Sequence, residues 1–325
     1  MSGLRALAAL AGLGVVAWLT WEVGPAALAT EMRQLSWRLG LLMLPQSLVT
    51  VLDAVGWRYA FPDRMPGLAL LVGARLAGEA VNDTTPTGTV GGEPLKAWLA
   101  RRAGVPFDEG IASVVIAKTA LVASQLGFLA LGLALAGWRL HPASALVNVM
   151  TILLAAGMIA VGGFIWAQQH GLFGKSARAL AWLGIGIAGG LSDLDRHLRA
   201  FYRGRLDRFA LALLFHFLGW VAGGLEVWLA LRFFGQPINF ATAVVIEAFA
   251  TGIRSASFLV PAAIGVQEGG LVAIFVGFGL TAGAGLAFGL TRRIREAVWA
   301  ATGYAVLAAW REAHLPPRAD SIDAA

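Results

Sequence analysis

Cysteine is absent from the 325 residues, and charged residues are scarce. Without cysteine the chain forms no disulfide and offers no thiolate nucleophile and no sulfur ligand for a metal. Charged residues make up only 14% of the chain, whereas hydrophobic residues make up 58%. A soluble globular chain is about a quarter charged and about half apolar, and a soluble domain of this length could not bury so much apolar surface. The mean hydropathy of +0.71 therefore predicts a polytopic membrane protein.

Motifs of common catalytic and energy-coupling sites are also missing. The five histidines, at positions 141, 170, 197, 216 and 314, show no paired metal-ligand spacing. We interpret His216, alone in an apolar stretch, as a packed, hydrogen-bonded residue. Neither a Walker A sequence nor Gly-x-Ser-x-Gly occurs, so ATP-driven pumping and serine hydrolysis have no support. We expect no cofactor, no metal and no enzymatic activity. The net charge of +6 is typical of basic loops beside anionic lipid headgroups, and we expect no nucleic-acid partner.

Long apolar stretches predict an all-α fold with about six spanning helices. A spanning helix needs about 20 apolar residues. The candidates are 4–21, 39–57, 110–137, 143–167, 209–231 and 283–310. The first stretch resembles a signal peptide superficially, but no convincing cleavage site follows it. Trp18, Trp21 and Glu22 are typical of an interfacial helix end, so we expect this helix to be retained.

Two further apolar stretches, 66–102 and 240–278, are interrupted by Pro, Gly and ionisable residues. Arginines flank both ends of the first stretch, at positions 58, 64, 101 and 102, whereas uncharged sequence flanks the second. The first stretch is expected to be a re-entrant hairpin that opens to the cytoplasm, and the second a hairpin that opens to the outside. For the second, full crossing remains the alternative, because 240–258 is long enough to span.

The charge distribution also predicts the topology. Seven basic residues against three aspartates mark 168–208 as a cytoplasmic amphipathic segment, which either anchors the topology or binds anionic lipid. Alternation of the spans then places both termini in the cytoplasm of a bacterial cell, with the protein in the inner membrane. We expect a single transmembrane domain over 1–311, with halves of about 1–142 and 143–311. A polar cytoplasmic tail, 312–325, follows it.

The two interruptions share a pattern. NDTTPTGTVGGEPLK covers residues 82–96 and PAAIGVQE covers 261–268, and in both a Pro is followed by a Gly-containing stretch and a Glu. Broken helices at membrane depth are buried in protein or line a water-filled cavity, because unpaired backbone groups are costly in hydrocarbon. Such breaks in both halves of a transporter indicate a substrate site and an inverted repeat. The alternative is a pair of ordinary Pro/Gly kinks.

Ionisable residues in the apolar stretches indicate a polar interior. Charge at the bilayer centre costs about 2.5–3.5 kcal/mol even on lenient scales, so these residues should pair or line a hydrated cavity. Arg292 and Arg293 lie well inside the last expected span, where they could bind phosphate or pair with Glu247, Glu268 or Glu296. Lys118 could contact a headgroup or pair with Glu93.

These sequences resemble the flippase-like transmembrane domain of lysylphosphatidylglycerol synthases and its stand-alone relatives, over roughly 5–312. Relatives have a Pro, then Gly-Glu, then a basic residue in the first half, and Pro-Gly-Gly-Ile-Gly before a Glu in the second. An Arg in the last helix is also usual. Here Ala262 and Ala263 replace two glycines, which predicts a stiffer turn. The stretch at 82–88 is most similar to the branch associated with hopanoid biosynthesis. The soluble aminoacyl-transferase domain has no counterpart in these 325 residues, so the resemblance implies lipid handling and not lipid aminoacylation.

Together these features predict a lipid flippase that works by alternating access at a midplane headgroup site built from the two broken hairpins. The lipid would be an anionic phospholipid, a hopanoid-related lipid or another polar lipid. The alternative is a non-transporting scaffold of a lipid-biosynthesis or envelope complex, with lipid-biosynthesis proteins as partners. The expected substrate-binding residues are Glu79, Asn82, Asp83, Thr84, Thr85, Pro86, Gly91, Gly92, Glu93, Lys96, Lys118, Arg254, Pro261, Gly265, Glu268, Arg292 and Arg293.

Overall fold

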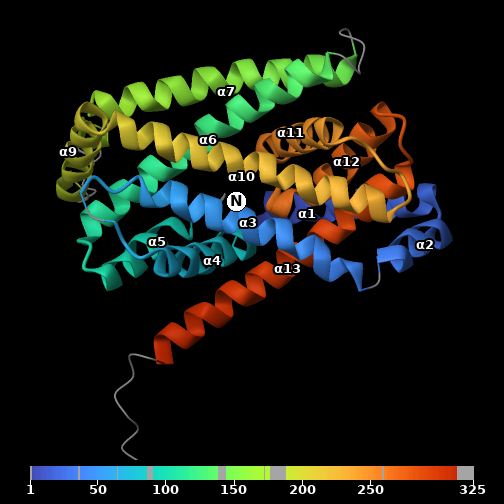
Figure 1. Ribbon diagram of the computed structural model, residues 1–325, viewed down its shortest axis with the longest axis horizontal. Helices are drawn as coiled ribbons and strands as arrows, with labels where there is room; N and C mark the ends of the chain where they lie inside the picture. The colour runs from blue at the N-terminus through green and yellow to red at the C-terminus, as the bar shows by residue number, and fades with distance from the viewer. Residues whose placement is uncertain are drawn as a thin grey trace, which may run out of the picture.

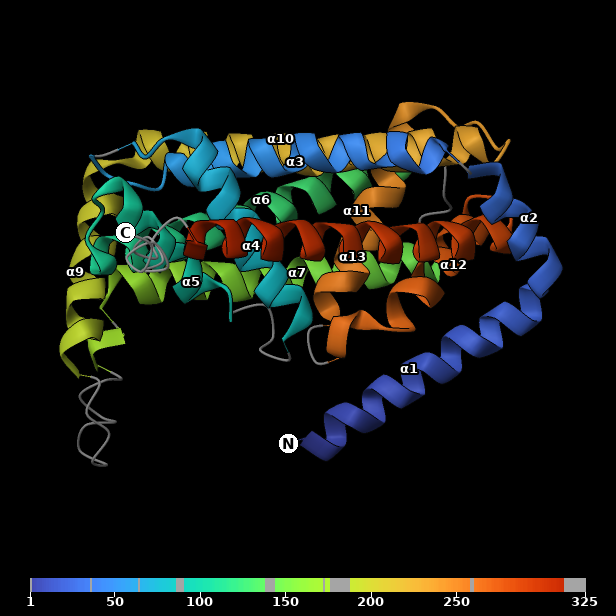
Figure 2. The ribbon, with the colours of Figure 1, turned by 90° about the horizontal axis from the view of Figure 1, so that it is seen from below.

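The computed structural model describes residues 2–35, 37–63, 65–85, 91–137, 144–171, 173–175, 188–257 and 260–312. Within these ranges every regular element is a helix, and most of the long helices follow the longest axis of the molecule (Figure 1, Figure 2). The expected all-α polytopic fold is confirmed.

Four helices are long and apolar enough to cross a membrane. They are α3 (Arg38–Arg58), α6 (Phe107–Ala136), α7 (Ala145–Gln169) and α10 (Leu206–Phe233). The bent pair of α1 (Ser2–Val23) and α2 (Pro25–Leu35) would add a fifth, with an angle of 89° between its two arms. The 31-residue helix α13 (Ala282–Glu312) occupies the last expected span. Its charged residues at 292, 293, 295 and 296 make it too polar to qualify by composition.

Both interrupted stretches are helical hairpins. The first contains α4 (Leu68–Thr84) and α5 (Glu93–Ala100), and a 3-10 turn, η1 (Arg101–Ala103), follows it. The second contains α11 (Phe240–Ala256), the 3-10 turn η2 (Pro261–Ala263) and α12 (Val266–Gly277). None of these four helices exceeds 17 residues, about 25 Å at 1.5 Å per residue, so each is short for a span. In Figure 1 the first hairpin lies toward the left end of the molecule and the second toward the right.

The order span, broken hairpin, span occurs twice, as α3–α4–α5–α6 and as α10–α11–α12–α13. The first spans of the two repeats, α3 and α10, pack along each other and run in opposite directions (Figure 1). The last span of each repeat packs on the hairpin of the other, since α13 contacts α4 and α6 contacts α11. This reciprocal packing is the arrangement expected of an inverted repeat.

Helix α9 (Ala188–Gly204) connects the repeats together with α7 and lies across the left end of the spans in both views (Figure 1, Figure 2). It buries Leu194, Leu198 and Phe201 against its neighbours, while the side chain of Arg196 is 69% exposed. The expected amphipathic character is therefore present over 188–204, and the apolar face packs on protein. Residues 172 and 176–187 of the expected segment, and 313–325 of the tail, lie outside the described residues.

Candidate functional site

A cluster of alternating charges fills the first hairpin. Lys96 on α5, only 4% exposed, places its ammonium 2.6 Å from Glu79 Oε1 and 3.1 Å from Glu93 Oε1. Lys118 on α6 approaches the same Glu93 oxygen at 3.4 Å. We call these four residues the first-hairpin cluster. The expected pairing of Lys118 with Glu93 is thus present.

Asn82 connects the two helices of the first hairpin by hydrogen bonds next to the break. Its side-chain oxygen accepts a hydrogen bond from the backbone N–H of Gly92 at 2.7 Å, and its amide donates to Glu93 at 3.2 Å. A Cβ on Gly92 would overlap the carbonyl oxygen of Gly78, so only glycine fits where the returning chain crosses α4. The polar residue before the break therefore replaces the helical hydrogen bonds that the break removes.

Three residues outside the expected set extend this cluster. The guanidinium of Arg75 lies 2.6 Å from Asp53 Oδ2 and 3.9 Å from Glu79. The other oxygen of Asp53 lies 2.7 Å from Nδ1 of His216 on α10. The sequence could have pointed to Arg75, because residues 75, 79 and 82 are spaced by four and three positions and therefore share one face of α4. The contact between Asp53 and His216 joins the two repeats, and no local sequence pattern predicts it. The packed, hydrogen-bonded state expected for His216 is confirmed.

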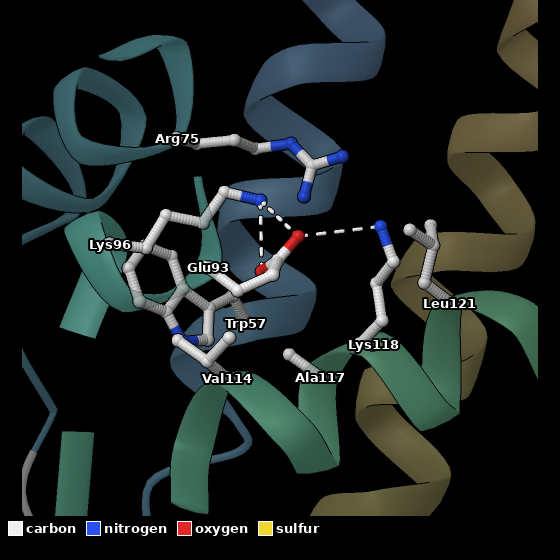
Figure 3. A pocket seen from close by; sticks show the side chains of 8 residues that line it. All are labelled: Trp57, Arg75, Glu93, Lys96, Val114, Ala117, Lys118 and Leu121. Carbon is white, nitrogen blue, oxygen red and sulfur yellow. Dashed lines mark hydrogen bonds and ion pairs between the residues drawn. The ribbon is translucent and has the colours of Figure 1, made fainter. Parts of the chain in front are cut away.

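A small pocket opens beside the first-hairpin cluster (Figure 3). Its lining consists of Trp57, Arg75, Glu93, Lys96, Val114, Ala117, Lys118 and Leu121. The space amounts to about 20 Å³, enough for about one water molecule. Charged nitrogen atoms from three helices converge on Glu93 and its surroundings, so the pocket is polar although apolar side chains form one wall (Figure 3). A lipid headgroup would require this pocket to widen.

A second cluster surrounds the break of the second hairpin. Glu268 accepts a hydrogen bond from Arg293 Nε at 2.7 Å and caps α12 by accepting the N–H of Gly265 at 2.7 Å. Gly265 has φ +80°, a conformation that favours glycine. Arg293 also contacts Glu296 at 3.1 Å, and Glu296 pairs with Arg254. We call residues 254, 268, 293 and 296 the second-hairpin cluster.

Arg292 belongs to a separate, deeper set. Arg292 is 3% exposed and pairs with Glu247. Its Nε also lies 3.9 Å from Glu226 of α10. Arg295 lies 3.1 Å from Glu226 and donates to Gln46 of α3. Arg292 therefore links α13 to α10 and α11 through ion pairs. This is the structural pairing that the sequence left open as the alternative to phosphate binding. Glu226, Arg295 and Glu296 were not among the expected site residues, although all three are charges within apolar stretches.

The tips of the two hairpins meet. Asp83 at the end of α4 lies 3.9 Å from Arg254 near the end of α11, and about a third of each side chain is exposed. Next to Asp83, the hydroxyl of Thr84 forms a hydrogen bond with Tyr304 of α13. Residues that the sequence separates by about half of the chain are thus combined in one polar region.

The remaining expected residues flank the breaks. Thr85 follows the last residue of α4, and its hydroxyl donates to the carbonyl oxygen of Val81 at 2.6 Å. Gly91 precedes Gly92 in the turn before α5, and Pro261 is the first residue of η2. Pro86 lies outside the described residues.

Comparison with known proteins agrees with this architecture. The sequence model described as "Lysylphosphatidylglycerol synthase TM region" matches residues 5–303, which is most of the chain and includes both hairpins. No curated protein and no solved structure matches the chain at a significant level. The family match and the membrane-spanning helices together indicate a membrane protein with a lipid-related role. The chain belongs to the family of the lysylphosphatidylglycerol synthase transmembrane region.

Proposed function

We propose that this protein moves a polar or anionic lipid between the leaflets of the bacterial inner membrane. The observation that carries the proposal is the contact between the hairpin tips, where Asp83 of the first hairpin meets Arg254 of the second-hairpin cluster. Irregular backbone and partly exposed charges at such a junction are typical of the substrate site of a transporter built from inverted repeats. Membership of a lipid-related membrane family supports the same function.

On binding, the charged groups of the headgroup would replace ion pairs that the described conformation forms within the clusters. Lys96, Lys118 and Arg254 would bind a phosphate, while Glu79 and Asp83 would bind an ammonium or hydroxyl groups. Because the pocket holds only about one water molecule, it would have to widen before a headgroup could enter, and in the proposed cycle this conformation would be a closed one. Opening would separate one last span from the hairpin it covers, α13 from α4 on one side or α6 from α11 on the other.

Basic residues support the proposed orientation. Arg101, Lys175, Arg196 and Arg203 all have exposed side chains. Arg101 belongs to η1, Arg196 and Arg203 belong to α9, and Lys175 lies in the described segment 173–175; α9 lies across one end of the spans (Figure 1). Under the positive-inside rule this end, at which α13 also ends (Figure 2), faces the cytoplasm.

The direct test is lipid movement in proteoliposomes. Purified protein is reconstituted with fluorescent phosphatidylglycerol or phosphatidylcholine, and a membrane-impermeant quencher reports the fraction that reaches the outer leaflet. We expect wild-type protein to accelerate movement and Lys96→Gln to abolish most of the gain. Lys175→Gln removes an exposed lysine and serves as the matched control. Size-exclusion chromatography verifies that each variant is folded.

Absence of movement of any tested lipid, including hopanoid-related lipids, would contradict transport. Co-purification of lipid-biosynthesis proteins with a chain that moves no lipid would favour the scaffold instead. Native mass spectrometry of gently extracted protein would then show whether a defined lipid remains bound.

A further inference from the structure

A buried histidine–aspartate pair lies directly behind the first-hairpin cluster, where the proposed function leaves it without a role. His216 is 1% exposed and Asp53 is 5% exposed. The pair lies where α3 crosses α10, and each residue faces a glycine of the opposite helix. A Cβ on Gly56 of α3 would lie 2.8 Å from His216 Nε2, and one on Gly219 of α10 would lie 3.2 Å from Asp53 Oδ1. The crossing thus provides a fitted space for both side chains.

One nitrogen of this imidazole is available for a proton. Nδ1 lies 2.7 Å from the Asp53 carboxylate, which can only accept, so the neutral ring donates from Nδ1. Nε2 is buried and has no hydrogen-bond partner among the described residues. Uptake of one proton at Nε2 would convert the neutral imidazole to imidazolium beside the Asp53 carboxylate.

A continuous line of charges connects this pair to the proposed headgroup site. Asp53 is bound to Arg75 at 2.6 Å, Arg75 lies 3.9 Å from Glu79, and Glu79 is bound to Lys96 at 2.6 Å. Arg75 also lines the small pocket, which can hold a water molecule (Figure 3). Arg75 thus links the Asp53–His216 pair to the small pocket.

The charges around His216 come from several helices. Asp53 of α3 faces it directly, and behind Asp53 lie Arg75 and Glu79 of α4, Glu93 and Lys96 of α5 and Lys118 of α6. The charged residues that α11 and α13 contribute near α10, Glu247, Arg292 and Arg295, are grouped around Glu226 further along that helix. With a neutral imidazole, the line from Asp53 to Lys118 contains three carboxylates and three cations.

We propose that the Asp53–His216 pair is a proton-binding site coupled through Arg75 to the headgroup site, and this inference rests on the proposed function. An imidazolium competes with Arg75 for Asp53, so Arg75 turns toward Glu79 and Glu79 holds Lys96 less tightly. The ammonium of Lys96 then becomes available to a phosphate. By thermodynamic reciprocity, binding of an anionic headgroup draws a proton onto His216. The site therefore takes an anionic headgroup and a proton together.

Calorimetry of the full chain in phosphatidylcholine nanodiscs tests this coupling. The probe is dihexanoyl phosphatidylglycerol, titrated in two buffers of different ionisation enthalpy, so that the heat difference gives the protons taken up per lipid. We expect wild-type protein to take up a fraction of a proton at pH 7. We also expect it to bind about fivefold more tightly at pH 6 than at pH 8. His216→Gln, whose amide still donates to Asp53, should bind the probe without proton uptake and without the pH dependence. Asp53→Asn is a second variant with the same expected loss.

His197→Gln, on α9 and partly exposed, is the matched control and should keep both properties. Proton uptake that persists in His216→Gln would overturn the inference while leaving the headgroup site intact. Absence of binding by wild-type protein, or binding that Lys96→Gln does not weaken, would overturn the proposed headgroup site and with it the coupling. The two failures are therefore distinguishable.

Discussion

Glu93 and Glu268 occupy equivalent positions in the two repeats. Each lies at the start of the second helix of its hairpin, and each pairs with a cation on the last span of its own repeat. These cations are Lys118 on α6 and Arg293 on α13. The Pro-to-Glu pattern in the sequence pointed to the two glutamates, and the structure gives them corresponding partners. If the two carboxylates are equivalent, neutralising either one should have the same effect on lipid movement.

We expect Glu93→Gln and Glu268→Gln each to slow lipid movement about tenfold or more, because each change removes the carboxylate that pairs a hairpin with the last span of its own repeat. The proteoliposome assay with fluorescent phosphatidylglycerol measures the effect. Glu22→Gln alters an exposed glutamate of α1 and should leave the rate unchanged. Full activity of both hairpin variants would show that the repeated glutamates are structural.

Ala262 and Ala263 carry backbone strain. Both have φ of +50°, a conformation that favours glycine, at the two positions where the resemblance implies glycines. The stiffer turn expected from the sequence thus takes the form of left-handed alanines, a conformation that costs a residue with a Cβ about 1–3 kcal/mol. The carbonyl oxygen of Ala262 accepts a hydrogen bond from Arg293 at 2.7 Å, so the strained turn is tied to α13.

Ala262→Gly should therefore stabilise the protein by about 0.5–1 kcal/mol, the relief of strain less the added entropy of the unfolded chain. Thermal unfolding in detergent measures the shift. The same substitution in the exposed helical position Ala308 should destabilise by about 0.5–1 kcal/mol. Equal shifts of the same sign at both positions would show that the turn is not strained.

At the scale of the elements, α13 packs on α4 and covers part of the first hairpin. Gly303 of α13 contacts α4 so closely that a Cβ would overlap the carbonyl oxygen of Leu76 and lie 2.7 Å from Cβ of Ala80. Tyr304, the next residue, binds Thr84 at the hairpin tip. Gly303 and Tyr304 together hold α13 against the middle and the end of α4.

Gly303→Ala should force α13 away from α4 and destabilise the protein by about 1–3 kcal/mol, as overpacking does in cores. Gly269 of α12 has open space where a Cβ would lie, so Gly269→Ala should instead stabilise by about 0.5–1 kcal/mol. Thermal unfolding of both variants in the same detergent decides the point. Opposite signs support the close contact, and a neutral Gly303 variant would contradict it.

At the scale of the whole molecule, the two hairpins enter the bundle from opposite ends (Figure 1). The chain contains no cysteine, so single cysteines report accessibility without a background. Ala103 follows the first hairpin, and Pro237 precedes the second; both are exposed. If the hairpins open to opposite sides of the membrane, these two positions face different compartments.

We expect a membrane-impermeant maleimide to label Ala103→Cys only in inverted inner-membrane vesicles and Pro237→Cys only in intact spheroplasts. Ala200→Cys, on the exposed face of α9, should behave as Ala103→Cys does. The readout is the labelled fraction of each variant. Labelling of Ala103→Cys and Pro237→Cys from the same side would contradict the inverted arrangement.

The sequence by itself determined the class of fold and the position of the helices. Apolar runs of spanning length and the scarcity of charge are local properties, and they predicted α3, α6, α7 and α10 within a few residues. The breaks in the hairpins were also predictable, because Pro and Gly disrupt a helix wherever they occur in it. Charged residues near the breaks supplied most of the candidate site.

Only the tertiary structure decided how these charges combine. Asp53, Arg75 and His216 lie on three helices, and their contact depends on the crossing of α3 with α10. Arg292 and Arg293 are neighbours in sequence, yet successive residues of a helix point about 100° apart, so one pairs with Glu247 in the core and the other with Glu268 at the hairpin. The meeting of Asp83 with Arg254 likewise follows from packing between the repeats, which no local pattern encodes.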